Sequence, residues 1–284
     1  MQRVLKFGIT FILLSLYIGL KGQHITINEG IQKISNTALY YEYRFHQPTT
    51  NQPTIVFEAG ARNSSGYWNG IIDSVSHFAN TLRYDRAGLG RSVGSTDSIR
   101  SSTQIALELK ALLDSLEIFS PLILVCHSAG GFYGRTFASE FKDRVRALVL
   151  IESSCDIWED MLSASLTKNQ KNERFRAQNN QRANFPIFQR LEYEAAPVTR
   201  SILSQQSELQ IPVYIIHGNQ HNWPSGYPST ELEDKWKVCQ EKLLYLSEQS
   251  SLQVVNGAGH HIFSEFDLAN CLKSKFSNNR IREK

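Results

Sequence analysis

The segment from Pro121 to Phe141 places the strongest constraint on how this chain can fold. Its first part, Pro121 to Val125, is an uninterrupted apolar run with the length and composition of a buried strand. Ser128 follows between small residues, and Phe132 to Phe141 is compatible with a helix. A strand that passes into a helix through such a serine has the layout of a nucleophile elbow. In that turn the hydroxyl projects from the edge of a sheet, and small neighbours avoid a clash between the two backbones.

The rest of the chain alternates between strand-like and helix-like segments. Strands are predicted at Ile25–Asn28, Ala38–His46, Thr54–Glu58, Thr81–Tyr84, Leu122–Cys126, Ala147–Ile151, Val213–His217 and Leu252–Val255. Helices are predicted at Trp68–Phe78, Ser102–Leu116, Gly131–Phe141, Glu231–Gln249 and Phe266–Ser277. This alternation predicts an α/β fold with a mostly parallel central sheet flanked by helices. Ligands of such sheets bind beyond the carboxyl ends of the strands.

The strand pattern disappears between Asp156 and Leu209. This stretch is polar, with glutamine, asparagine and arginine interleaved with aromatic residues. We predict a helical cap here, inserted after the sixth strand of the sheet, that covers the site and shapes substrate choice. A polar excursion with no role in the site is the alternative.

Four motifs together carry a resemblance to a known family. Thr54–Ala61 is a strand that runs into a glycine turn, Tyr84–Ser92 reads YDRAGLGRS, Cys126–Gly131 reads CHSAGG, and Gly257–His260 reads GAGH. In this order and at these spacings the chain resembles the α/β-hydrolase superfamily, in particular its serine-hydrolase branch with a helical cap. The resemblance extends from about residue 25 to residue 276. The chain departs from the usual G-x-S-x-G elbow, because Cys126 takes the place of the first glycine.

The resemblance implies roles for four residues. Ser128 would be the nucleophile, and His260 would be the base that takes its proton and later returns it to the leaving group. His261 is the competing histidine, but the residue directly after the GAG turn matches the family's histidine. The oxyanion hole would be formed by the backbone N–H groups of Ala129 and Ala61, which do not depend on side chains.

The acid of the expected triad is where this chain departs further from the family. Relatives commonly carry aspartate in the loop after the seventh strand, but this chain has His221 at that place, and histidine cannot be the anionic partner. Glu152 ends the neighbouring strand, and the order of serine, acid and histidine is preserved if it is used. We therefore predict Glu152 as the acid. Asp156, Glu231 or no carboxylate at all are the alternatives.

Other polar residues invite a functional interpretation that we do not adopt. Asp85 and Arg86 form a conspicuous pair, but such a turn is expected to tie loops together. His217 and His221 are spaced like zinc ligands on a helix, yet they lie at a strand end. No metal and no cofactor are predicted.

The amino terminus has the pattern of an export signal. Arg3 and Lys6 form a positive region, Phe7–Leu20 is an apolar stretch of signal-peptide length, and Gly22 precedes the expected mature start at Gln23. The apolar run is shorter than the roughly 20 residues of a membrane helix. We predict a signal peptide at residues 1–22 and a periplasmic or secreted product, with a retained anchor as the alternative. Residues 23–284 would form one domain, with the cap at about 156–209.

Composition and cysteine content narrow the possible partners. A formal net charge of +3 is too small and too scattered to indicate nucleic acid or a membrane surface, so we expect a small-molecule substrate.

Cys126 is expected to be a buried, free packing residue. One bridge is possible among Cys155, Cys239 and Cys271, but the sequence does not choose a pair and we predict none.

The sequence therefore predicts an exported serine hydrolase that cleaves an ester, thioester, lactone or small amide. A prolyl-type aminopeptidase is an alternative. Such an enzyme would need acidic residues in the cap to hold the substrate amine, and this chain has several there. Candidates for that task are Glu159, Asp160, Glu173, Glu192 and Glu194. A protein of the same fold that binds small molecules without turnover is the alternative from another class.

Overall fold

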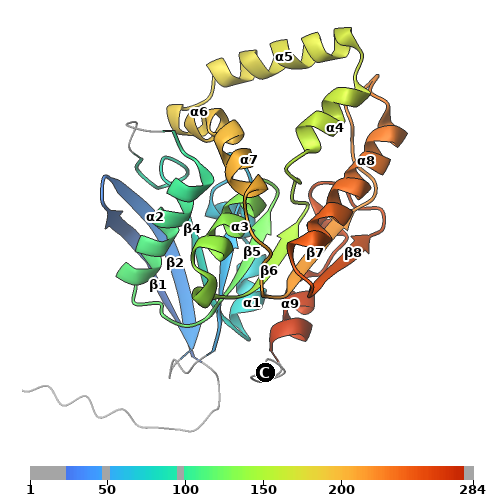
Figure 1. The fold of residues 1–284 in the computed structure, drawn as a ribbon. Coiled ribbons are helices and arrows are strands. Elements are labelled where there is room, and N and C mark those ends of the chain that lie inside the picture. Colours follow the sequence, from blue (N-terminus) through green and yellow to red (C-terminus); the bar gives the residue numbers. More distant parts are fainter. Residues whose placement is uncertain (1–23, 47–51, 95–98, 278–284) are drawn as a thin grey trace, which may run out of the picture.

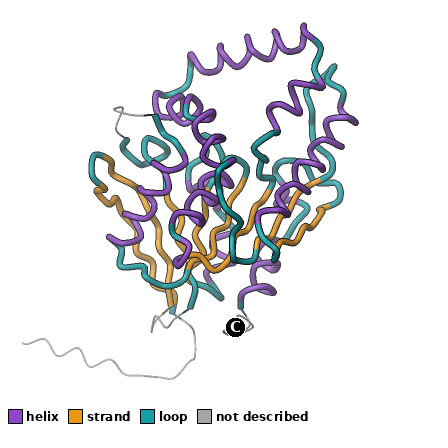
Figure 2. Tube along the Cα trace, in the orientation of Figure 1, coloured by secondary structure: helices purple, strands orange, loops and turns teal. Residues whose placement is uncertain are grey.

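The computed structural model describes residues 24–46, 52–94 and 99–277 (Figures 1 and 2). The predicted signal peptide and its cleavage site lie outside these residues. Within them, no helix is both long enough and apolar enough to cross a bilayer.

An eight-stranded sheet forms the centre of the molecule, in the order β1-β2-β4-β3-β5-β6-β7-β8. The strands are β1 Ile25–Ile34, β2 Thr37–His46, β3 Thr54–Glu58, β4 Asn80–Tyr84, β5 Leu122–His127, β6 Val145–Ile151, β7 Val213–Gly218 and β8 Ser250–Val255. The two pairings made by β2 are antiparallel, and all the others are parallel. All eight predicted strands are present, and the predicted fold class is confirmed.

Helices cover both faces of this sheet (Figure 1). They are α1 Ile71–Ser76, α2 Ser102–Ser115, α3 Gly130–Glu140, α4 Trp158–Ser165, α5 Lys168–Ala183, α6 Ile187–Glu194, α7 Ala196–Ser204, α8 Ser229–Lys242 and α9 Leu268–Phe276. Short 3-10 turns lie at Ser65–Trp68, Lys142–Arg144, Leu243–Leu246 and Ile262–Ser264. On one face α2, α3 and α8 share a buried core, and on the other α1 and α9 share a second. The apolar stripe of α2, including Leu109, Leu112 and Leu113, is buried as its helical spacing predicts.

The parallel register brings several chain segments together at one edge of the sheet. His127 of β5 is paired with Ile151 of β6, and Ile151 is paired with Ile216 of β7. Gly218 of β7 is paired with Val255 of β8. The residues that follow β5, β6, β7 and β8 therefore leave the sheet side by side, although Ser128 after β5 and His260 after β8 are 132 residues apart in the sequence.

The four helices α4 to α7 lie between β6 and β7 in the sequence and stand above this edge of the sheet (Figure 1). Helix α5 runs across the top between α4 and α6 and buries none of its residues. Its first turn is closed by a capping box, in which Thr167 and Gln170 satisfy each other's backbone N–H. At the base of α4, Trp158 packs edge-on against Trp236 of α8, with ring centroids 4.8 Å apart.

A disulfide joins Cys155, just before α4, to Cys239 of α8, with Cα atoms 5.4 Å apart. Our expectation of no disulfide was wrong. The two cysteines are separated by 84 residues in the sequence, and only the packing of α8 against the start of the cap brings them together. Cys126 is free and fully buried in β5, as predicted.

Candidate active site

Ser128 lies on a strained turn between β5 and α3. Its backbone φ is +53°, which is uncommon for any residue other than glycine. Small residues are required around it. A Cβ on Gly130 would lie 2.6 Å from the carbonyl oxygen of Glu58, and one on Gly131 would overlap the Ser153 side chain. The elbow predicted from the sequence is therefore present, and Cys126 occupies the first-glycine position inside the strand.

The structure brings His260 to this serine. The Ser128 hydroxyl lies 3.1 Å from Nε2 of His260, which follows β8. His261, the competing histidine, turns away, and its Nδ1 lies 3.1 Å from the Tyr67 hydroxyl. Of the two neighbouring histidines, only His260 is therefore in hydrogen-bond reach of Ser128.

Glu152 lies on the other side of His260. Its Oε2 is 3.4 Å from Nδ1 of His260, and its Oε1 accepts a hydrogen bond from the backbone N–H of Gly218. The side chain is completely buried, and burial alone would favour the neutral acid. Hydrogen bonds from His221, His260 and Gly218 outweigh that effect and lower the pKa of Glu152 to about 2. The carboxyl is therefore ionised at neutral pH.

The alternative acids lie elsewhere. Asp156 accepts a hydrogen bond from Arg135 at 2.7 Å. Glu231 is exposed on α8 and pairs with Lys235 at 2.8 Å. Of the three carboxylates considered from the sequence, Glu152 is the one that the structure places beside His260.

His221, in the loop after β7, lies between two carboxylates. Its Nε2 is 2.8 Å from Oε2 of Glu152, and its Nδ1 is 2.9 Å from Oε1 of Glu233. Glu233 also accepts hydrogen bonds from the backbone N–H of His221 and the indole N–H of Trp223. Burial lowers the pKa of His221, but the two carboxylates outweigh it and raise that pKa above the usual value. An imidazolium can donate from both nitrogens, which fits this position.

Sequence reasoning missed Glu233 and Tyr67. Glu233 belongs to α8, and its contact with the loop after β7 follows no sequence pattern. Tyr67 belongs to the 3-10 turn after β3, and no sequence pattern marks it. Its hydroxyl lies 3.0 Å from Nε2 of His127, the residue before Ser128.

His127 makes a hydrogen bond to the backbone of His260. Its Nε2 lies 2.9 Å from the His260 carbonyl oxygen, and because a carbonyl can only accept, this nitrogen carries the proton. Burial, together with the neighbouring histidines, lowers the pKa of His127 to about 3. His127 is therefore neutral and buried at neutral pH, as a packing residue would be.

The two predicted oxyanion donors, Ala61 and Ala129, line one cavity of the protein. In the part of the chain that the structure describes, neither Ala61 nor Ala129 donates its backbone N–H to another backbone group. Arg86 holds the turn before Ala61, because its guanidinium donates to the carbonyl oxygens of Ala59 at 2.7 Å and Gly60 at 2.9 Å. Both N–H groups are thus free for a ligand.

Asp85 and Arg86 tie loops together, as predicted. Asp85 accepts hydrogen bonds from the backbone N–H groups of Ser65 at 2.6 Å and Arg91 at 2.8 Å. Arg86 is buried and pairs with Glu58 of β3 at 2.6 Å and with Glu192 of α6 at 2.9 Å. The cap is thereby linked to the loop that carries Ala61.

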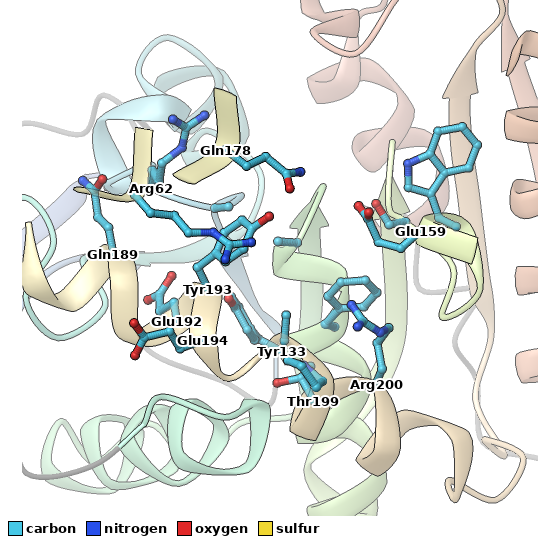
Figure 3. Close-up of a pocket in the computed structure, with 18 of the residues that line it drawn as sticks. Arg62, Tyr133, Glu159, Gln178, Gln189, Glu192, Tyr193, Glu194, Thr199 and Arg200 are labelled. Atoms are coloured by element: carbon cyan, nitrogen blue, oxygen red, sulfur yellow. The ribbon is translucent and has the colours of Figure 1, made fainter. Parts of the chain in front are cut away.

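Two cavities meet at this site. The first, here called the cap cavity, has a volume of about 680 Å³ and is lined by Ala61, Ala129 and side chains of α5, α6 and α7 (Figure 3). The second, here called the histidine cavity, has a volume of about 780 Å³ and is lined by Ser128, His260 and His221. Ser154, Trp158 and Glu159 line both. Across the described ranges, no three or more histidine, cysteine, aspartate or glutamate side chains are arranged to hold a metal ion.

Comparison with known proteins gives partial matches to several proteins, some of which are named as hydrolases. A 32% identical relative is the uncharacterized protein YqjL of Bacillus subtilis, matched over 38% of this chain and 42% of that protein. The putative carbamate hydrolase RutD of Pseudomonas syringae is 31% identical over 40% of this chain and 44% of its own length. A proline iminopeptidase of Saccharolobus solfataricus is 26% identical over 47% of this chain and 43% of its own length. The matches therefore span less than half of these relatives.

Structural similarity extends over most of the chain. Est816, described as an N-acyl homoserine lactone degrading enzyme, superposes with a TM-score of 0.59 at 17% identity and covers 87% of this chain and 97% of that one. At this identity the likeness concerns the fold. The family model of the alpha/beta hydrolase fold matches residues 53–168, which include the elbow and both strands that flank it in the sheet. The chain has the α/β-hydrolase fold.

Proposed function

We propose that this protein is an exported serine hydrolase that cleaves an ester, thioester, lactone or small amide through an acyl-enzyme at Ser128. The observation that carries the proposal is the line of three groups at the sheet edge. Ser128 Oγ lies 3.1 Å from Nε2 of His260, whose Nδ1 faces the buried carboxylate of Glu152 at 3.4 Å. A serine needs an adjacent base to become a nucleophile, and that base needs an orienting partner.

The proposed reaction follows from these positions. Ser128 Oγ attacks the carbonyl carbon of the substrate while its proton passes to Nε2 of His260. The negative charge that develops on the carbonyl oxygen is stabilised by the N–H groups of Ala61 and Ala129. When the tetrahedral intermediate collapses, the bond to the leaving group breaks and His260 returns the proton to it. Water then attacks the acyl-enzyme with His260 as base, which releases the acid and restores Ser128.

The aminopeptidase alternative requires a free carboxylate to hold a substrate amine. Glu159, Glu192 and Glu194 line the cap cavity, whereas Asp160 and Glu173 do not. Glu192 is engaged by Arg86, and Glu159 by Arg174 at 2.8 Å. The partial match to a proline iminopeptidase is the observation in favour of this reading. The engagement of these carboxylates weighs against it.

Export is part of the proposal. The leader-like pattern at the amino terminus is supported by the Cys155–Cys239 disulfide, because disulfides persist mainly in oxidising compartments. The substrate would be a small molecule that reaches the enzyme outside the cytoplasm.

Covalent labelling tests the nucleophile. A fluorophosphonate probe should modify the mature protein at Ser128 and should not modify the Ser128→Ala variant. A panel of 4-nitrophenyl esters and aminoacyl anilides then separates esterase from peptidase activity. Equal labelling of the variant would remove Ser128 from the mechanism, and labelling of neither protein would favour a binding protein without turnover.

A further inference from the structure

The cap cavity is lined by positive charges that have no acidic partner within residues 24–46, 52–94 and 99–277. Three arginines line it, namely Arg62, Arg182 and Arg200. Among the described residues, none of the three has a carboxylate oxygen within 4 Å of its guanidinium group. These three cations therefore face the cavity without an anionic partner from the protein.

The carboxylates of the same cavity are all paired with other arginines. Asp156 pairs with Arg135, Glu159 with Arg174, Glu192 with Arg86 and Glu194 with Arg190, at distances from 2.7 to 3.7 Å. None of these partner arginines lines the cavity. Each of these carboxylates therefore has a cationic partner outside the cavity lining, whereas the three arginines of the lining have no anionic partner within the described ranges.

Two of the unpaired arginines are held by aromatic rings. Arg182 of α5 lies over the ring of Tyr193, 4.0 Å from its centroid, and its buried Nε has no hydrogen-bond partner. Arg62 lies 5.1 Å from the ring centroid of Phe185. Figure 3 shows Arg200 extending from α7 on the side of the cavity where Glu159 also projects. Stacking on aromatic faces holds a guanidinium group in place while leaving its N–H groups free to bind an anion.

The two cavities would hold the two parts of a substrate that lie on either side of the bond to be cleaved. The leaving group must lie where His260 can protonate it, and His260 lines the histidine cavity. The carbonyl oxygen must lie between the N–H groups of Ala61 and Ala129, which line the cap cavity. The acyl part of the substrate therefore extends into the cap cavity, toward the unpaired arginines.

We propose that the acyl group of the substrate ends in a carboxylate, which Arg62, Arg182 and Arg200 bind in the cap cavity. This inference rests on the proposed hydrolase function and adds the class of its substrate, a monoester or monoamide of a dicarboxylic acid. A guanidinium group matches a carboxylate in shape and charge and can donate two parallel hydrogen bonds to it. An acyl group with an amine at its end would instead place like charges together.

The test uses two 4-nitrophenyl esters that differ only in charge. One is the monoester of adipic acid, which ends in a carboxylate, and the other is the ester of adipamic acid, which ends in a neutral amide. We expect the mature protein to prefer the anionic ester by roughly tenfold or more in kcat/KM, because hydrogen bonds to ionised groups are about twice as strong as neutral ones. Added salt should reduce this preference.

Single variants locate the binding groups. Arg62→Gln, Arg182→Gln and Arg200→Gln should each lower the ratio of the two kcat/KM values. Arg176→Gln is the matched control, because Arg176 belongs to α5 like Arg182 but does not line the cavity, and it should keep the wild-type ratio. A wild-type preference for the neutral ester, or an unchanged ratio in all three cavity variants, would overturn the inference.

Labelling separates this inference from the proposed function. Adipate should slow fluorophosphonate labelling of Ser128, whereas adipamide at the same concentration should not, and this comparison needs no turnover. A protein that is labelled but protected equally by both compounds would contradict only the carboxylate inference. A protein that is not labelled at Ser128 and cleaves neither ester would contradict both.

Discussion

The carboxylate of Glu152 accepts a hydrogen bond of 2.8 Å from Nε2 of His221, and the same oxygen lies 3.4 Å from Nδ1 of His260. One buried oxygen thus serves two imidazoles. The shorter contact goes to His221, which Glu233 holds from the opposite side. The carboxylate beside His260 therefore follows β6, whereas the loop after β7 carries a histidine whose pKa the two carboxylates raise.

Glu152→Gln tests the role of this carboxylate. We expect kcat to fall by up to about 10⁴-fold, or about 5.5 kcal/mol of barrier, because a neutral amide no longer holds His260 in the correct tautomer or stabilises its imidazolium. Ester hydrolysis and thermal unfolding should be measured together, so that loss of activity is not confused with loss of fold. Glu231→Gln is the control, since that carboxylate lies on α8 away from His260. Activity of Glu152→Gln within a few-fold of wild type would end the assignment, and Asp156→Asn would be measured next.

His221→Gln tests the contribution of this imidazole, because an amide can still donate a hydrogen bond to Glu152 but cannot take up a proton. We expect kcat to fall by up to about tenfold, because the two carboxylates favour the protonated imidazole and the amide should hold Glu152 less firmly beside His260. If His221 acts only through Glu152, the double variant with Glu152→Gln should have the kcat of Glu152→Gln alone. Additive losses in that double variant would show that His221 acts independently of Glu152.

Much of the architecture could be predicted because each strand has its own local pattern. The segment from Leu122 to Cys126 is apolar without interruption, and in the sheet every residue of β5 is buried. Helix ends were harder to place. The helix predicted to begin at Trp68 begins at Ile71, because residues 65–68 form a 3-10 turn and Gly70 adopts a φ of +79°. The helix predicted to run to Gln249 ends at Lys242, and a 3-10 turn follows it.

The site was predictable only where a residue directly follows a strand. Ser128 and Glu152 follow β5 and β6, so the parallel sheet places both at the same edge. Glu233 and Tyr67 could not be found in this way, because their contacts depend on how a helix and a loop pack over that edge. The same holds for the arginines of the cap cavity, because their lack of acidic partners in the described segments of the chain becomes apparent only when the partner of each carboxylate is known.

The buried His127 predicts how stability changes with pH. Its pKa is lowered to about 3 in the folded protein, whereas in the unfolded chain it is about 6.5. The unfolded chain therefore binds a proton that the folded protein excludes, and His127 destabilises the fold as the pH falls below about 6.5, by up to about 1.4 kcal/mol per pH unit. His127→Gln should weaken this acid dependence of the unfolding free energy between about pH 6 and pH 4. Urea unfolding of wild type, His127→Gln and the exposed-site control His77→Gln measures it, and equal slopes in all three would contradict the prediction.

Export is tested by expressing the chain with its own amino terminus in a bacterial host. We expect the product outside the cytoplasm, beginning close to Gln23, with Cys155 and Cys239 joined. Because a closed loop restricts the unfolded chain, reduction of this bridge, which spans 84 residues, should lower the unfolding free energy by about 2–4 kcal/mol. Cys271→Ser is the matched control, since Cys271 is free and its loss should leave the effect of reductant unchanged. A membrane-bound product with Met1 intact would favour an anchor, and full stability in reductant would mean that the bridge does not support the fold.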